Sequence, residues 1–359
     1  MNAVAITGIG LIVPAGTDLS ALKDPMPQRS NDALQISSVP QIDGLSKNDA
    51  RRMSKLTRYS IFAANNALRM SGNSSEAMNI YIALTHGSTS LLEEFHTYLF
   101  DYGPEMASPN TFSNGVTNAP LSSISSFAKI KQGGTTILGY ENAGCDALNY
   151  CANAIMDKEH DACLVGASEE YSEIVLDAYK KCGWYNTLNP KCLPYHFKSG
   201  DHKTGFGVGE GSAFFTVESK SHCNSRNGKA LCLYKPVEIE SDNISADMII
   251  CGSGAGPQDG YELDILKDIA KSNRGNKPVL LFSKPFFGES FALGSMLSCC
   301  MAFAALQNNI IIPSFPLHPD IINMYTTECT VPPHKILVIS SGRNGQVSAG
   351  MFLENQSFE

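Results

Sequence analysis

The sequence of 359 residues lacks several features that would assign it to a class of protein at once. It has no Lys/Arg-rich stripe or tail, and 27 basic against 35 acidic residues give a net charge of −8, so nucleic acid is not an expected partner. The longest apolar stretch, 286–306, contains Glu289 and several serines and glycines, which favours a buried helix over a membrane span. The apolar opening, 1–17, has no basic leader and is interrupted by Pro14, so it predicts a strand and a turn, not a signal peptide.

The 11 cysteines also lack the order that disulfide partners or metal ligands would show. There is no CxxC pair and no Cys/His spacing typical of a metal site. Free cysteines pack as small hydrophobic residues. We therefore expect buried thiols in a reducing cytoplasm, with no bound metal.

Short β-like runs alternate with helical patterns, which predicts α/β layers with mainly parallel strands. The first cycle of this alternation covers residues 1–218. After a polar segment rich in turn residues, a second cycle covers residues 229–359, with a helix expected at about 260–272, an apolar helix after Gly288 and two closing strands. The prediction is two similar α/β halves of unequal length.

Five segments, in this order, resemble the motif blocks of β-ketoacyl synthases. They are VAITGIGLIVPAG, DACLVGASE, GFGVGEGSAFFTVE, FFGESFALGSM and ILVISSGRNGQVSAGMF. The resemblance spans nearly the whole chain. It implies the thiolase fold, in which two similar halves form a layered αβαβα arrangement.

Condensing enzymes of this family use a cysteine nucleophile and two histidines. The cysteine begins a buried helix, whose dipole stabilises the thiolate, and the histidines stabilise the enolate formed when a malonyl unit loses carbon dioxide. By resemblance, these three positions fall on Glu141, Cys251 and Glu289, while Lys284 of the last motif is retained. None of the eight histidines occupies either imidazole position, so we expect no catalytic residue in this chain.

One subgroup of the family lacks the same triad, namely the chain-length factors, or β-subunits, of bacterial type II polyketide ketosynthases. Segment 141–148, ENAGCDAL, is similar to their nucleophile segment, with Glu141 where Gln is usual. The resemblance implies a chain-length subunit without a cofactor, paired in a heterodimer with a catalytic ketosynthase α-subunit and supplied by acyl carrier protein through the complex. The product would be a poly-β-ketone such as an anthraquinone-type aromatic polyketide, and an aryl polyene pathway is the alternative.

The resemblance also implies where this subunit meets its partner. The strand before the nucleophile segment would pair across the subunit interface, through Thr135, Thr136, Ile137, Leu138 and Gly139. The preceding segment, 110–117, would line the floor of the shared cavity through Thr111, Phe112, Gly115 and Val116. Most of these side chains are small and leave volume, which predicts a fairly long product.

Simpler interpretations remain for each of these positions. Glu141 fills a dead site, makes a contact that shapes the partner's tunnel, or interacts with a malonyl carboxyl group. Cys251 fits a packing role, and Glu289 fits a capping or buried hydrogen-bonding role. Cys145 is a rival nucleophile for a free-standing acyltransferase, although it lies one helical turn deeper than Glu141. A homodimeric scaffold or lipid-binding protein is a further alternative.

A Gly-rich segment, 205–211, superficially suggests a phosphate-binding loop. No lysine follows it at the spacing of such loops, and it continues directly into the strand-like SAFFTVE. We therefore expect a hairpin or a closely packed turn there.

Overall fold

The computed structural model describes residues 3–22, 33–183, 207–239, 244–252, 259–272, 277–307, 323–327, 329 and 332–355. In these ranges a two-stranded sheet pairs β2 (Ala33–Leu34) with β6 (Val208–Gly209). The other strands form one 10-stranded sheet: β1 (Val4–Ile12), β3 (Asn79–Leu84), β4 (Gly134–Leu138), β5 (Ala162–Glu169), β7 (Gly211–Glu218), β8 (Cys232–Val237), β9 (Met248–Cys251), β10 (Val279–Phe282), β11 (Lys335–Ser341) and β12 (Val347–Glu354). The helices are α1 (Lys47–Arg52), α2 (Lys55–Ser71), α3 (Thr89–Tyr102), α4 (Pro109–Gly115), α5 (Ala119–Ala128), α6 (Ala143–Met156), α7 (Glu173–Lys181), α8 (Lys220–Ser225), α9 (Asp259–Ser272), α10 (Lys284–Phe287) and α11 (Ala292–Leu306), with two short 3-10 turns, η1 (Leu19–Leu22) and η2 (Ser75–Ala77).

The large sheet repeats one topology twice. Its strand order is β10-β9-β11-β12-β8 in the second half and β4-β3-β5-β7-β1 in the first. When the five strands of each half are numbered along the chain, both halves have the order third, second, fourth, fifth, first. In each half the second strand pairs in parallel with the third and fourth, and the fifth pairs antiparallel with the fourth and the first. An antiparallel pairing of β1 with β8 joins the halves. The two similar halves are confirmed, but parallel pairing is confined to the outer strands and does not dominate as expected.

Helices α6 and α11 form the middle layer, because each contacts strands of both halves. Almost every residue of α11 is buried, as expected for a helix that is apolar on all sides. The two helices approach closely at Gly144, where a Cβ would lie 2.3 Å from the carbonyl oxygen of Ala292. This contact fixes the start of α6 beside the start of α11.

Further helices cover the outer faces of the sheet. Helix α2 packs on β1, β7 and β5 of the first half, together with α5, and apolar residues of α9 join the core of the second half. Ser54 caps α2 by accepting a hydrogen bond from the Thr57 N–H at 3.0 Å, and Gly72, with φ of 61°, ends it. No helix in the described ranges has the length and apolar character needed to cross a membrane.

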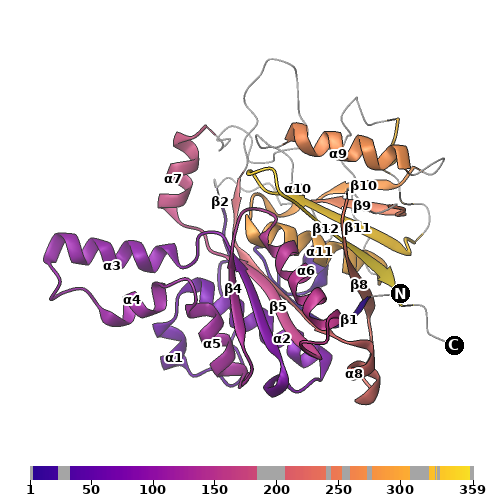
Figure 1. Cartoon of the computed structure of the whole chain (residues 1–359). Coiled ribbons are helices and arrows are strands. Elements are labelled where there is room, and N and C mark those ends of the chain that lie inside the picture. The colour runs from indigo at the N-terminus through magenta and orange to yellow at the C-terminus, as the bar shows by residue number, and fades with distance from the viewer. Residues whose placement is uncertain are drawn as a thin grey trace.

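Two features lie apart from this core. Strand β4 forms one edge of the large sheet and pairs only with β3 among the described strands. Helices α3 and α4 project beyond the sheet, at the left of Figure 1. This side of the molecule therefore offers both an open strand edge and exposed helices.

Candidate functional site

The position expected for the nucleophile holds an ion pair. Glu141 lies two residues before the start of α6, and its side chain is buried. Arg343, in the turn between β11 and β12, donates from Nε to Glu141 Oε1 at 2.8 Å and also from Nη2 to the same oxygen. Its backbone N–H donates to Glu141 Oε2 at 3.1 Å. One residue thus supplies both oxygens of the carboxylate with donors.

Both members of this pair are charged at neutral pH. Burial raises the pKa of Glu141, but the hydrogen bonds and charge of Arg343, with a further contribution from Lys284, bring that pKa below its usual value. Burial lowers the pKa of Arg343, and the bonds and charge of Glu141 more than offset this. A charge-assisted, two-oxygen contact therefore stands where the resemblance leads us to expect the nucleophile position.

Aromatic rings enclose the Arg343 guanidinium. Its Nη1 donates to the Tyr179 hydroxyl at 2.8 Å, and its Cζ lies 5.0 Å from the centre of the Tyr179 ring. The rings of Tyr140 and Phe291 lie at 5.8 and 5.9 Å from Cζ. Burial raises the pKa of Tyr179 to about 12, so its hydroxyl stays protonated. Arg343 thus fills the space in front of Glu141 and is held there by cation–π contacts.

The position expected for the second histidine also holds an ion pair. Lys284 Nζ lies 2.6 Å from Glu289 Oε2, and both side chains are almost fully buried. Glu289 Oε1 accepts a hydrogen bond from the Phe291 N–H at 2.8 Å, at the start of α11, which is the hydrogen-bonding role expected from its position. Phe291 has a φ of 51°, a conformation that non-glycine residues rarely adopt. Lys284 therefore pairs with Glu289, the residue expected in place of the second histidine.

Cys251, expected at the position of the first histidine, lies at the end of β9 and is fully buried. Its thiol donates to Glu262 Oε2 at 3.7 Å, and the Ser341 hydroxyl donates to Glu262 Oε1 at 2.5 Å. Glu262 comes from α9. Cys251 is thus packed against a buried carboxylate.

His86 also belongs to this region, although sequence reasoning did not select it. It follows β3, and its ring lies 4.4 Å from that of Phe291 and 5.9 Å from that of Tyr179. Its Nδ1 is 3.4 Å from Glu169 Oε2. Arg343 was missed as well, since 202 positions separate it from Glu141. A lone arginine in a Gly-rich turn after a buried strand was the only sequence signal for it.

Cys145 does not face this cluster. It is fully buried in α6, its Sγ lies 4.0 Å from the Tyr234 hydroxyl, and its backbone N–H donates to Ser295 of α11 at 3.1 Å. Burial and a hydrogen bond with Cys145 raise the pKa of Cys299 well above its usual value. All cysteines in the described ranges are free thiols. Cys145 is therefore part of the packing between α6 and α11.

The residues expected to line the cavity lie on or just after α4. Thr111 and Val116 are half-buried, and Phe112 is exposed on one side while its ring lies 5.2 Å from that of Phe95. Gly115 is buried, and a Cβ there would lie 3.0 Å from Leu92 Cδ2. The expectation that Gly115 leaves open volume is therefore wrong, because Leu92 already fills that space.

The residues expected at the interface lie on β4 and just beyond it. Thr135 and Leu138 are exposed, while Thr136, Ile137 and Gly139 are half-buried. The edge of β4 opposite β3 pairs with no described strand. This arrangement leaves backbone groups and the Leu138 side chain open to a second molecule.

The described part of the Gly-rich segment is closely packed, as expected, whereas Gly205 lies outside the described residues. A Cβ at Gly209 would lie 2.0 Å from the carbonyl oxygen of Phe287, and one at Gly211 would lie 2.4 Å from that of Ile12. Any side chain at either position would force the backbone apart. These glycines therefore allow neighbouring backbone segments to approach closely.

Comparison with known proteins places this geometry in context. The sequence model of the family described as "Beta-ketoacyl synthase, N-terminal domain" matches residues 36–222. The chain is 26% identical over 262 residues to a "Putative polyketide beta-ketoacyl synthase 1" of Streptomyces halstedii, covering 64% of this chain and 61% of that protein. It is 23% identical over 249 residues to a "3-oxoacyl-[acyl-carrier-protein] synthase 2" of Staphylococcus aureus, covering 62% and 59%. The alignments thus span roughly three fifths of these relatives.

Solved structures are similar over the whole chain. "The ishigamide ketosynthase/chain length factor" gives a TM-score of 0.78 at 16% identity, covering 98% of this chain and 99% of that one. "AntDE:AntF (apo): type II PKS acyl-carrier protein in complex with its ketosynthase bound to the hexaketide" gives 0.73 at 19% identity, with the same coverage. At these identities the likeness shows the fold, and it is the layered thiolase-like fold of ketosynthases.

Proposed function

The chain belongs to the β-ketoacyl synthase family, and on that premise we propose that it is the non-catalytic, chain-length-setting subunit of a heterodimeric type II polyketide ketosynthase. The partner is a catalytic ketosynthase α-subunit with a complete Cys-His-His triad. Acyl carrier protein delivers malonyl units to the complex, which extends a poly-β-ketone. The cytoplasmic location and the division into halves at 1–218 and 229–359 stay predictions.

One observation carries this proposal: the reactive positions are filled by ion pairs that are complete within the chain. Glu141 is neutralised by Arg343, and Glu289 by Lys284. A carboxylate engaged by a guanidinium offers neither a thiolate for acyl transfer nor a donor for an enolate. Decarboxylation through Glu141 would first require separation from Arg343. The geometry therefore favours the filled dead site over a malonyl contact.

The rival acyltransferase reading depends on Cys145, and its surroundings argue against it. A nucleophilic cysteine needs an accessible position and a partner that stabilises the thiolate. Cys145 is fully buried, and its thiol neighbours a tyrosine hydroxyl. No described imidazole contacts it.

The open edge of β4 supports pairing with a second subunit. An exposed strand edge is a template for another strand, and Leu138, with 56% of its surface exposed, lies on it. Tyr140, just beyond the strand, and Tyr150 of α6 are exposed nearby along the chain. We therefore assign residues 135–139 to the proposed subunit interface.

The test is reconstitution with a co-expressed ketosynthase that retains the complete triad. We expect the pair to co-purify and to extend malonyl units, while this chain alone has no condensation activity. Leu138→Asp should weaken the pairing at least about tenfold, because it places a charge in an apolar contact. A stable, well-behaved monomer that ignores the ketosynthase would contradict the proposal, and a homodimer that binds lipid would favour the scaffold alternative.

Chain length is tested separately on α4. Thr111→Trp should shorten the product without loss of the heterodimer, because Thr111 is only half-buried and is expected to line the shared cavity. Gly115→Trp is the contrasting variant: it should destabilise the chain by about 1–3 kcal/mol, since Leu92 occupies its space. Mass spectrometry of the products and thermal unfolding are the measurements. Unchanged product length with Thr111→Trp in an intact heterodimer would remove α4 from the cavity wall.

A further inference from the structure

Helix α3 carries a large surface that no described element covers. None of its residues, all of which are described, is buried. Phe100 and Tyr102 are 78% and 65% exposed, and Ile174 of the neighbouring α7 is 54% exposed. Soluble proteins rarely leave such apolar groups together in water unless another molecule covers them.

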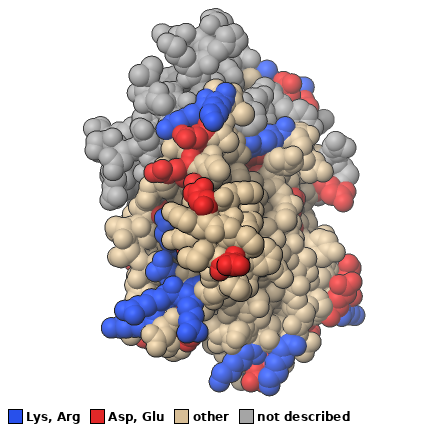
Figure 2. Space-filling model, turned by 90° about the vertical axis from the view of Figure 1, so that its left-hand side faces the viewer, with Lys and Arg blue, Asp and Glu red and all other residues tan. Residues whose placement is uncertain are grey.

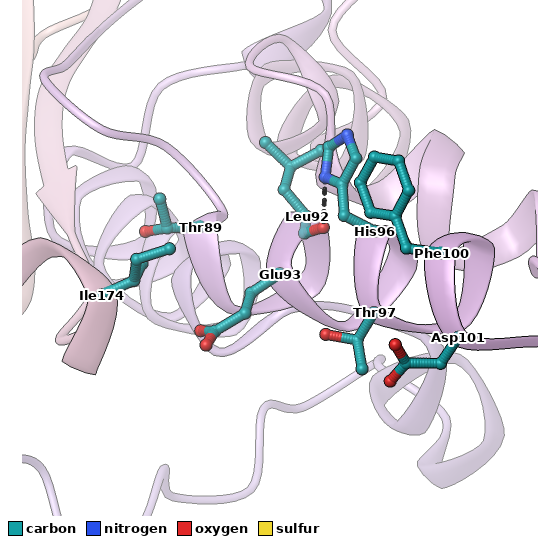
Figure 3. A pocket seen from close by; sticks show the side chains of 8 residues that line it. All are labelled: Thr89, Leu92, Glu93, His96, Thr97, Phe100, Asp101 and Ile174. Atoms are coloured by element: carbon teal, nitrogen blue, oxygen red, sulfur yellow. Dashed lines mark hydrogen bonds between the residues drawn. The ribbon is translucent and has the colours of Figure 1, made fainter.

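Two rows of side chains run along this helix (Figure 3). They border a hollow of ≈ 520 Å³ that Ile174 closes at one end. Successive members of each row are four residues apart, so they lie on one face of the helix. The first row is polar and acidic and the second is apolar and aromatic: Thr89, Glu93, Thr97 and Asp101, then Leu92, His96 and Phe100.

Contacts within the helix fix the apolar row. The His96 Nδ1–H donates to the Leu92 carbonyl oxygen at 2.7 Å, and the His96 ring stacks on Phe100 with 6.1 Å between ring centres and 19° between planes. Parallel ridges at this spacing form a groove into which a ridge of another helix packs. The shape of the hollow therefore suits a helix.

The charge of α3 restricts which kind of helix could bind in the hollow. The helix contains Glu93, Glu94 and Asp101 but no lysine or arginine. Glu93 and Asp101 are separated by about 12 Å along the axis, from a rise of about 1.5 Å per residue. Asp101 lies in the last turn, where the helix dipole disfavours an acid. A cation from outside α3 would offset this unfavourable placement.

We propose that this groove is the docking site for a helix of the catalytic ketosynthase subunit, and that this helix places Lys or Arg side chains opposite Glu93 and Asp101. The inference rests on the proposed function, because it takes the catalytic subunit as the partner. The apolar row supplies buried area, and the acidic row supplies charge complementarity. Figure 2 shows the same face as mainly uncharged, with Lys and Arg gathered towards its margins.

The same charges select against a second copy of this chain. If two copies crossed about a two-fold axis at Thr97, Glu93 of each would face Asp101 of the other, and the like charges would repel twice. One groove buries too little area to hold a dimer by itself. It therefore acts beside the β4 edge as the element that selects the heterodimer over the homodimer.

The test compares two variants of equal charge in the full chain. Glu93→Lys/Asp101→Lys reverses the acidic row, and Glu94→Lys/Glu105→Lys makes the same change at exposed positions that do not line the hollow. Affinity for the co-expressed catalytic ketosynthase is measured by sedimentation at low and high salt. The groove variant should bind at least about tenfold more weakly and with less dependence on salt, and the control within about threefold of the wild type.

Self-association of this chain alone gives a second readout. Asp101→Lys should increase it, because each lysine would then face Glu93 of the other copy. If both double variants bind the ketosynthase equally well and the wild type also binds it, the groove is not the docking site, and the proposed function still stands. A wild type that binds no catalytic ketosynthase would overturn both.

Discussion

The centre and the rim of this chain use charge in opposite ways. At the centre, Glu141 is paired with Arg343 inside the fold, surrounded by aromatic rings. On the rim, Glu93 and Asp101 are exposed on a helix without a cation of its own. The central charges are thus paired within one chain, whereas those of the rim are exposed to solvent and open to the contact with a second subunit that we propose. This contrast agrees with the proposed role of a non-catalytic subunit that acts through its contacts.

Arg343→Ala should have the largest effect on stability, because it disrupts the ion pair at the centre. It removes the cation but leaves the Glu141 carboxylate in the interior, which typically destabilises a protein by about 3–5 kcal/mol. The loss of the cation–π contacts with Tyr179 adds to this. Denaturant unfolding of the purified chain is the measurement.

The matched control is Glu141→Gln/Arg343→Met, which removes both charges and approximates their volume. It should recover most of the lost stability, since buried ion pairs are often no better than apolar replacements. If Arg343→Ala unfolds at the wild-type denaturant concentration, Arg343 does not hold the centre, and the contrast with the rim fails.

The fold itself was largely predictable, for physical reasons that also show the limit. Short apolar runs located strands such as β1, and the helical pattern of apolar side chains located helices such as α9. Strand direction was predicted less well. Alternating strands and helices indicate parallel pairing, but β11 and β12 form a hairpin without an intervening helix, and β7 pairs antiparallel with both of its neighbours.

At the site, sequence reasoning located positions but not partners. Motif spacing placed Glu141 at the start of a helix, because helix starts are local features. Its pairing with Arg343 and that of Glu262 with Cys251 depend on how segments distant in the sequence meet in the fold, which no local pattern contains. The prediction of open volume at Gly115 was wrong for the same reason, since a small residue leaves volume only if no neighbour such as Leu92 fills it.

The pH dependence of stability gives a second, smaller effect that tests whether the central ion pair is charged. The pKa of Glu141 is lower in the folded chain than its usual value, so the unfolded chain binds the proton more tightly. The stabilisation is present above the unfolded pKa of about 4.3 and is lost as the pH falls through the folded value. The fall in unfolding free energy between neutral and acidic pH should therefore be smaller in Glu141→Gln/Arg343→Met than in the wild type. An identical fall in both proteins would show that the pair is not charged as described.

Cys145→Ala should have the smallest effect, and it tests whether the centre keeps any hidden chemistry. Removing one buried sulfur between α6 and α11 costs about 1 kcal/mol, as for other deletions of a single buried heavy atom. The reconstituted complex should form the same products at the same rate, because the thiol contacts Tyr234 in the core and not the Glu141 cluster. Product yield by mass spectrometry and labelling by a thiol-directed ketosynthase inhibitor are the measurements, with the catalytic cysteine of the partner as the positive control. Condensation by this chain alone that disappears with Cys145→Ala would place the nucleophile here after all, and the ion pairs of the centre would then no longer mark a site that has lost its reaction.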